Sequence, residues 1–115
     1  MMQTPRQAFP VHVRTGWIDF SPALHSYVTW RVTRTLGTFA SRVASVTVRI
    51  ANQEPHDPAS RLCAIDITLK AGGAISTVST GRDVYDVVNH ATDGILTKLR
   101  AVREIESPDA LPRIA

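Results

Sequence analysis

Two aromatic side chains and two arginines lie close together within one short segment of this sequence. Tyr27 and Trp30 are followed by Arg31 and Arg34. Arginine presents a planar fork of donors that suits phosphate oxygens, and an aromatic ring offers a face for a stacked base. The four side chains therefore fit a phosphate backbone with stacked bases. A second interpretation stays open, in which the rings pack at a sheet edge and the arginines extend into water.

A second group of cations lies near the end of the chain. Lys98, Arg100 and Arg103 occupy the last turns of an expected helix. They are candidates for the same kind of nucleic-acid contact. Cations in that place also complement the negative end of a helix dipole, which explains part of the cluster without any partner.

Residues that could support catalysis or bind a metal are scattered. His12, His25, His56 and His90 have no cysteine or second histidine at a ligand spacing. Cys63 falls in the apolar register of an expected strand, which is typical of a small buried hydrophobe. Neither a P-loop nor a G-x-G-x-x-G motif occurs. We therefore expect no enzyme, no metal, no cofactor and no small-molecule substrate.

Composition narrows the class of protein further. The chain has 115 residues, 43% of them hydrophobic, which suits one globular domain. Its net charge of +3 permits a nucleic-acid partner without requiring one. A single cysteine, a start that lacks the apolar core of a signal peptide and the lack of a long apolar run predict a soluble cytoplasmic protein without membrane contact.

The elements that must position these residues follow from hydropathy patterns. Alternation predicts strands over residues 11–20, 42–52, 61–70 and 74–81, the last with the weakest pattern. Ser21 and Pro22 start a helix over 22–39, whose apolar stripe is spaced by four residues. Gly37 is expected to close that helix. A second helix starts near Asp83, and its buried stripe comprises Val84, Val88, Ala91, Ile95, Leu99 and Val102.

This order predicts an α+β fold, β-α-β-β-β-α, with two helices on one face of a four-stranded sheet. The first crossover permits a parallel strand pair, and the later connections suit antiparallel pairs. Strands two and three carry no aromatic residue, so any RNA contact should come from the helices rather than the sheet. We expect an N-terminal extension over 1–10, one domain over 11–105 and a short tail over 106–115.

Two segments resemble a known family. "DFSPALHSYVTWRVTRTLGTFASRVASVTVRI" and "GRDVYDVVNHATDGILTKL" are similar to the ribosome hibernation promoting factors, also called ribosomal subunit interface proteins. The likeness covers roughly residues 11 to 103. Its most specific pieces are Ala23-Leu24, Tyr27-Val28, Phe39, Arg42 with Val43, and Asp83-Val84-Tyr85.

The resemblance implies a fold like that of double-stranded-RNA-binding domains. It also implies a translation inhibitor that binds rRNA of the small ribosomal subunit in the tRNA and mRNA channel. Arg31 and Arg34 fall where the family carries basic residues on its first helix. The chain resembles the short members, which lack a C-terminal dimerisation domain, and its oligomeric state is left open.

The second helix departs from the family pattern. Gly94 and Thr97 stand where the family usually carries a lysine and another basic residue. An interior glycine also costs a helix about 1 kcal/mol relative to alanine. The alternative function is therefore a protein-interaction or self-associating module that does not bind ribosomes. An exposed fourth strand would be its contact surface.

Overall fold

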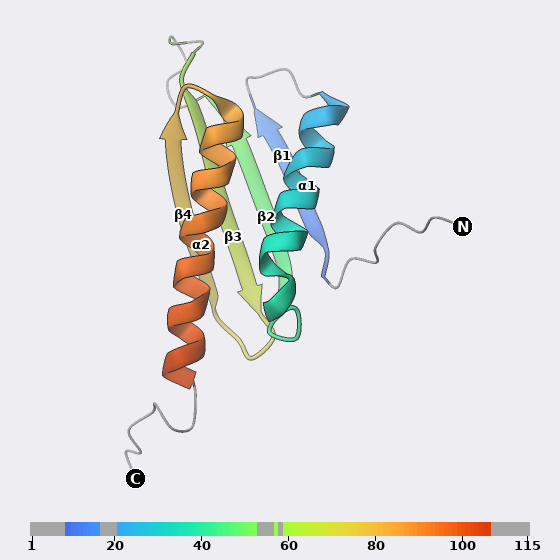
Figure 1. The fold of residues 1–115 in the computed structure, drawn as a ribbon, viewed down its shortest axis with the longest axis vertical. Helices are drawn as coiled ribbons and strands as arrows, with labels where there is room; N and C mark the ends of the chain where they lie inside the picture. Colours follow the sequence, from blue (N-terminus) through green and yellow to red (C-terminus); the bar gives the residue numbers. More distant parts are fainter. Residues whose placement is uncertain (1–8, 17–20, 53–56, 58, 107–115) are drawn as a thin grey trace, which may run out of the picture.

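The computed structural model describes residues 9–16, 21–52, 57 and 59–106, and it has the predicted order of elements (Figure 1). One sheet has the strand order β1-β2-β3-β4, and the two helices cover one of its faces. β1 runs parallel to β2, and the other neighbours are antiparallel. The predicted α+β class and topology are confirmed. The elements are β1 (Val11–Gly16), α1 (Pro22–Leu36), the 3-10 helix η1 (Gly37–Phe39), β2 (Val43–Ala51), β3 (Arg61–Leu69), β4 (Ala74–Gly81) and α2 (Val84–Glu106).

The first helix starts and ends where the sequence places its signals. The Ser21 hydroxyl accepts a hydrogen bond from the backbone N–H of Leu24 at 3.0 Å, and Pro22 opens the helix. The stripe at spacing four is buried. Gly37 ends the α-helix with a right-handed φ of −60°, so the chain tightens into η1 rather than turning left-handed. The predicted helix over 22–39 is therefore an α-helix that ends at Leu36, followed by a 3-10 turn.

The second helix begins on an aspartate cap. Asp83 Oδ1 accepts from the backbone N–H of Tyr85 at 2.8 Å and of Asp86 at 3.3 Å. The predicted stripe faces the sheet, with Val84 and Val102 only partly buried. The two helices run in the same direction (Figure 1). The fully buried members are Val88, Ala91, Ile95 and Leu99.

A tight hairpin joins β3 to β4. Gly72 and Gly73 have φ values of 105° and 87°, a region that glycine enters without steric cost. The Leu69 N–H donates to the Gly73 carbonyl at 3.0 Å. The predicted strand over residues 11–20 is described only as far as Gly16, and residues 17–20 lie outside the described residues.

Cys63 lies in the core, as its register predicts. Its side chain is buried on β3 between the sheet and the helices. Burial disfavours the thiolate and raises the pKa of the thiol from 9.0 to about 12. The sulfur is therefore protonated at neutral pH and packs as a small apolar group.

The sheet face opposite the helices carries polar side chains. Arg14 on β1 lies beside Arg49 on β2 in the parallel register. Arg49 forms an ion pair with Asp66 at 3.1 Å, and the Ser76 hydroxyl donates to the other carboxylate oxygen at 2.6 Å. Val78 on β4 is 60% exposed on this same face. The core therefore lies on the helix side of the sheet.

Candidate nucleic-acid interface

An exposed aromatic cluster spans the two helices. We define it as Tyr27, Trp30, Arg34 and Tyr85. The ring centroids of Tyr27 and Tyr85 are 4.9 Å apart in an edge-on arrangement, and those of Tyr27 and Trp30 are 6.1 Å apart. The Arg34 guanidinium lies 5.4 Å from the centre of the Trp30 ring. Trp30 is 54% exposed and Tyr85 40% exposed, so two ring faces and one cation are presented to solvent together.

Arg31 is engaged between the helices. Its Nε donates to Asn89 Oδ1 at 2.9 Å, and its two terminal nitrogens contact Thr35 Oγ1 at 3.0 Å and Asp93 Oδ1 at 3.1 Å. The Tyr27 hydroxyl donates to the same Asn89 oxygen at 2.6 Å. Arg31 therefore ties α1 to α2, and Asn89 holds Tyr27 through the same oxygen. Only part of its donor capacity is left for a phosphate.

The three predicted cations of α2 do not form one group. The Lys98 ammonium donates to the Ser76 carbonyl and so lies against β4, away from α1. Arg100 is exposed, seven residues after Asp93 and therefore on the side of α2 that faces α1. Arg103 lies in the last turns of α2, and its side chain is outside the described residues. The structure brings Tyr27, Trp30, Arg31 and Arg34 together and separates Lys98 from them.

Gly94 lies on the β4 side of α2. A Cβ at this position would come within 3.1 Å of the Thr77 hydroxyl oxygen, which is tighter than ordinary contact. A basic side chain at 94 would therefore start at β4 rather than between the helices. Thr97 is exposed, and its hydroxyl donates to the Asp93 carbonyl at 3.1 Å. Gly94 has a packing role that the sequence pattern did not indicate.

Tyr85 is the functional candidate that the sequence interpretation missed. In the sequence Tyr85 stands out only as part of the Asp83-Val84-Tyr85 segment at the start of the second helix. Its ring completes the aromatic cluster because the parallel helices place it beside Tyr27. Tyr85 is 58 residues after Tyr27 in the sequence, so no local pattern predicts that the two rings meet. Only the packing of the two helices could reveal it.

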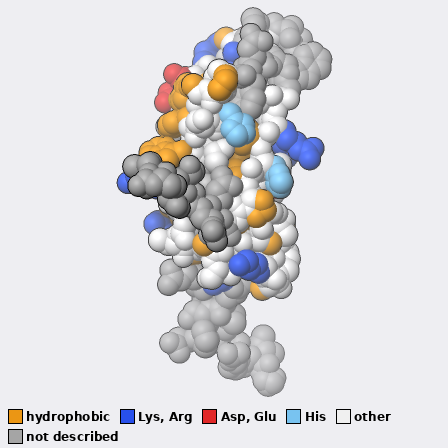
Figure 2. All heavy atoms as spheres, turned by 90° about the vertical axis from the view of Figure 1, so that its right-hand side faces the viewer, with side chains coloured by type: hydrophobic (Ala, Val, Ile, Leu, Met, Phe, Trp, Pro, Cys, Tyr) orange, Lys and Arg blue, Asp and Glu red, His pale blue; other side chains and the backbone are white. Residues whose placement is uncertain are grey.

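Acidic side chains limit the positive potential of this surface. Asp93 neutralises part of the Arg31 charge, and Asp86 is exposed in the first turn of α2. Figure 2 faces the β1 side of the molecule, next to this surface, and shows Lys and Arg side chains there in separate groups. The surface therefore suits contacts to a few phosphates combined with ring stacking, rather than a broad electrostatic attraction.

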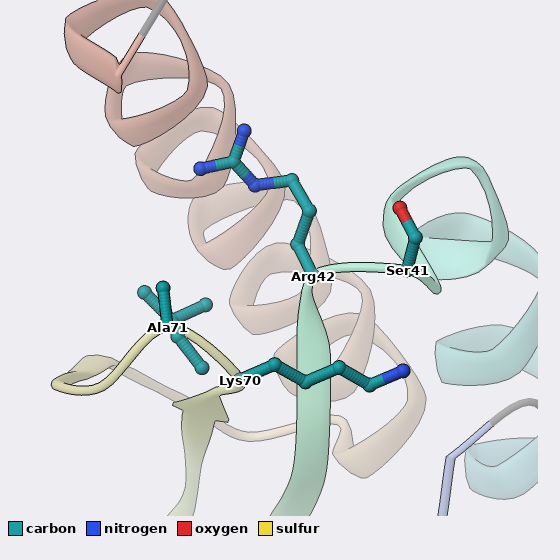
Figure 3. Close-up of a pocket in the computed structure, with 5 residues that line it drawn as sticks. Ser41, Arg42, Lys70 and Ala71 are labelled. Carbon is teal, nitrogen blue, oxygen red and sulfur yellow. The ribbon is translucent and has the colours of Figure 1, made fainter.

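A shallow pocket lies below the helices, where the α1–β2 turn meets the β3–β4 hairpin. It has a volume of about 220 Å³, and the Lys70 N–H donates to the Arg42 carbonyl at 2.9 Å across it. The side chains of Arg42 and Lys70 extend in different directions (Figure 3). It contains no acid–base pair. The lining residues are Ser41, Arg42, Leu69, Lys70 and Ala71.

Two other kinds of site are not found in the described part of the chain. Its His, Cys, Asp and Glu side chains form no group of three that could hold a metal ion. None of its helices is long and apolar enough to cross a membrane.

The fold and the aromatic cluster define a small two-layer α+β domain with an exposed ring-and-arginine surface between parallel helices. The chain is similar in fold to a ribosomal subunit interface protein from Coxiella burnetii, with a TM-score of 0.70 and 15% identity over 82% of this chain and 97% of that chain. It is also similar to the N-terminal domain of Protein Y from Thermus thermophilus, with a TM-score of 0.66 and 16% identity over 80% of this chain and 96% of that chain. No family model and no curated protein matches the chain. The expected likeness to ribosomal subunit interface proteins is confirmed at the level of the fold.

Proposed function

We propose that this protein binds the small ribosomal subunit and inhibits translation by occupying the tRNA and mRNA channel. The observation that carries the proposal is the fold, which covers nearly the whole length of a ribosomal subunit interface protein. Occupying the channel requires no chemistry and no cofactor. The protein would act in the cytoplasm, where idle ribosomes are found.

The aromatic cluster is the proposed contact with rRNA. Arg34 would pair with a phosphate, while Trp30 and Tyr85 present ring faces on which unpaired bases can stack. Arg100, on the side of α2 that faces α1, would add a second phosphate contact. An rRNA contact by Arg103 stays a prediction from the sequence. Tyr27 and Arg31 would hold the two helices in register beneath this surface. Lys98 points to β4 and is left out of the contact.

Co-sedimentation with ribosomes at two salt concentrations tests the proposal. Each phosphate contact adds a slope of about −0.7 to −0.9 in the logarithm of affinity against the logarithm of salt concentration. Binding by two or three cations should therefore weaken clearly but moderately with salt. Failure of the wild type to pellet with ribosomes at low salt would contradict the proposal.

Two variants with the same charge change locate the surface. Arg34→Glu should greatly weaken binding, because it places a carboxylate among phosphates and removes the cation beside Trp30. Arg14→Glu changes the opposite face of the sheet and is the matched control. Equal losses in both variants would show a non-specific charge effect and not contact through the aromatic cluster.

Footprinting of the small-subunit rRNA tests the place of binding. Protection of the tRNA and mRNA sites is expected, together with reduced synthesis in a purified translation system. Protection elsewhere on the subunit would agree with ribosome binding but would contradict inhibition by occupation of the channel. The protein-interaction module is the function that would remain if no ribosome binding were found.

A further inference from the structure

β4 is an edge strand of the sheet and has no charged side chain of its own. The strand pairs with β3 along its whole length without a register shift, and no described strand pairs with its other side. Residues 74–81 include neither a charged residue nor a proline. Edge strands are usually protected against pairing by lysine, proline or a bulge. By contrast, the β1 edge carries His12 and Arg14.

The outward-pointing hydrogen-bonding groups of this edge belong to alternate residues. Leu69 and Gly73 form a hydrogen-bonded pair at the hairpin, so the pairs alternate from there along β4. The N–H and carbonyl groups of Ser76, Val78 and Thr80 therefore point away from β3. The Ser76 carbonyl accepts from the Lys98 ammonium, which must release it before a partner strand can pair there. The contact of the Lys98 ammonium with the Ser76 carbonyl agrees with this direction, because Lys98 reaches it from outside the strand pair.

We propose that β4 pairs antiparallel with β4 of a second copy, about a two-fold axis at Val78. Val78 is 60% exposed on the face opposite the helices, and in this register it would contact the partner's Val78. Ser76 would lie opposite the partner's Thr80. The two four-stranded sheets would become one continuous sheet, with all helices on the same face. The proposal does not depend on ribosome binding.

Charges beside the two ends of β4 favour the antiparallel arrangement. Lys98 lies against Ser76, near the start of the strand. At the other end of the strand, Arg82 forms an ion pair with Asp57 at 3.6 Å, and the acidic Asp83 and Asp86 follow it. Because antiparallel pairing places the start of one strand beside the end of the other, the Lys98 ammonium would approach the partner's Asp83. A parallel arrangement would instead place like charges side by side.

The position of α2 adds contact area to the strand pairing. α2 packs over β3 and β4 and is therefore the helix nearest to this edge. A strand spacing of about 4.8 Å would bring the two α2 axes to about 10 Å, which is a normal distance for packed helices. Gly94 lies on the edge side of α2, and Ala101, seven residues later, is exposed on that same side. These small residues permit the close approach.

Sedimentation equilibrium of the full chain without ribosomes tests the proposal first. A concentration-dependent dimer is expected for the wild type. Val78→Lys should weaken it at least about fivefold, because two ammonium groups would meet at the two-fold axis. Thr68→Lys, an exposed position of the same face on β3, is the control and should keep the dimer. A wild type that is monomeric at all concentrations would overturn the proposal.

Cysteine cross-linking then tests the register. In a hydrogen-bonded antiparallel pair the two Cα atoms at position 78 would be about 5.5 Å apart, within the span of a disulfide. Val78→Cys should form a covalent dimer under mild oxidation, and Thr68→Cys should not. Cross-linking of Thr68→Cys alone would show that the sheets meet face to face, which contradicts pairing through the β4 edge. So would a dimer that survives Val78→Lys unchanged.

Discussion

Replacement of Arg31 tests whether this arginine holds the two helices together or is available to bind a phosphate. In Arg31→Met the aliphatic part of the side chain remains, and the contacts to Asn89, Thr35 and Asp93 are lost. Asn89 keeps the hydrogen bond from Tyr27, so no buried acceptor is left without a donor. The expected cost is therefore the sum of the lost bonds, without an added penalty for an orphaned group.

The magnitude follows from the exposure of each partner. The bond to Asn89 is partly buried and contributes about 1 kcal/mol. The ion pair with Asp93 contributes less than about 1 kcal/mol, because the Asp93 side chain is 64% exposed and solvent screens the pair. The partly buried bond to Thr35 contributes about 0.5 kcal/mol. The total is about 2 kcal/mol, which corresponds to a fall in Tm of about 8 °C for a domain of this size.

Urea unfolding followed by circular dichroism measures this cost. Arg34→Met is the matched control, because Arg34 lies one turn away and is exposed, with its guanidinium 5.4 Å from the centre of the Trp30 ring. Its expected effect is below about 0.5 kcal/mol. Equal stability of the two variants would refute the interhelical role. In that case Arg31 would be available to rRNA in the same way as Arg34.

Three further predictions follow from the structure. Gly94→Ala should stabilise the protein more in a Thr77→Ala background than in the wild type, because the tight contact of the new Cβ with the Thr77 hydroxyl is then absent. A thermal double-mutant cycle measures this difference, and additive changes in stability would contradict the prediction. Ser21→Ala should lower the free energy of unfolding by about 1 kcal/mol through loss of the cap on the Leu24 N–H, whereas Ser26→Ala, at an exposed position of the same helix, is the control for a serine-to-alanine change as such. Above pH 9 the unfolded thiol of Cys63 ionises while the folded thiol, with a pKa of about 12, stays protonated, so stability should fall by up to about 1.4 kcal/mol per pH unit; urea unfolding at pH 8 and pH 10 should show a smaller fall for Cys63→Ala.

The order of the elements could be predicted because the signals are local. Alternating strands, the Ser21 cap and the stripe at spacing four each lie within a few residues, so the sequence is sufficient to place them. The end of α1 was less well predicted. Gly37 marks it, but whether the chain turns left-handed or tightens into a 3-10 turn depends on how Phe39 packs into the core.

The candidate site could be predicted only in part. The four residues on α1 share one side of a helix, and spacing alone groups them. The partners of Arg31 on α2 are 58 and 62 positions further along the chain. The periodicity of one helix does not predict how a second helix packs against it, so these contacts could not be predicted. Lys98 and Arg100 are close in sequence but lie on different sides of α2. Their separation became visible only when β4 and α1 were in place.

The packing role of Gly94 could not be predicted from the sequence. Comparison with the family pattern presents it as a missing cation. In the structure it is the place where α2 approaches Thr77 of β4. A glycine in a sequence is compatible both with the loss of a charged side chain and with a close contact between two elements. Only the position of the neighbouring strand distinguishes them.

The parallel pairing of β1 with β2 has a consequence for the order of folding. β2, β3 and β4 follow one another through loops, and Ile67 pairs with Ile75 across a short hairpin. Val11 pairs with Val46 across a long intervening segment that includes the whole of α1. Closing that longer loop costs more chain entropy, so β1 and α1 should join last and exchange their amide hydrogens first. The aromatic cluster needs Tyr27 from α1 beside Tyr85 from α2, so it should assemble only at this final step.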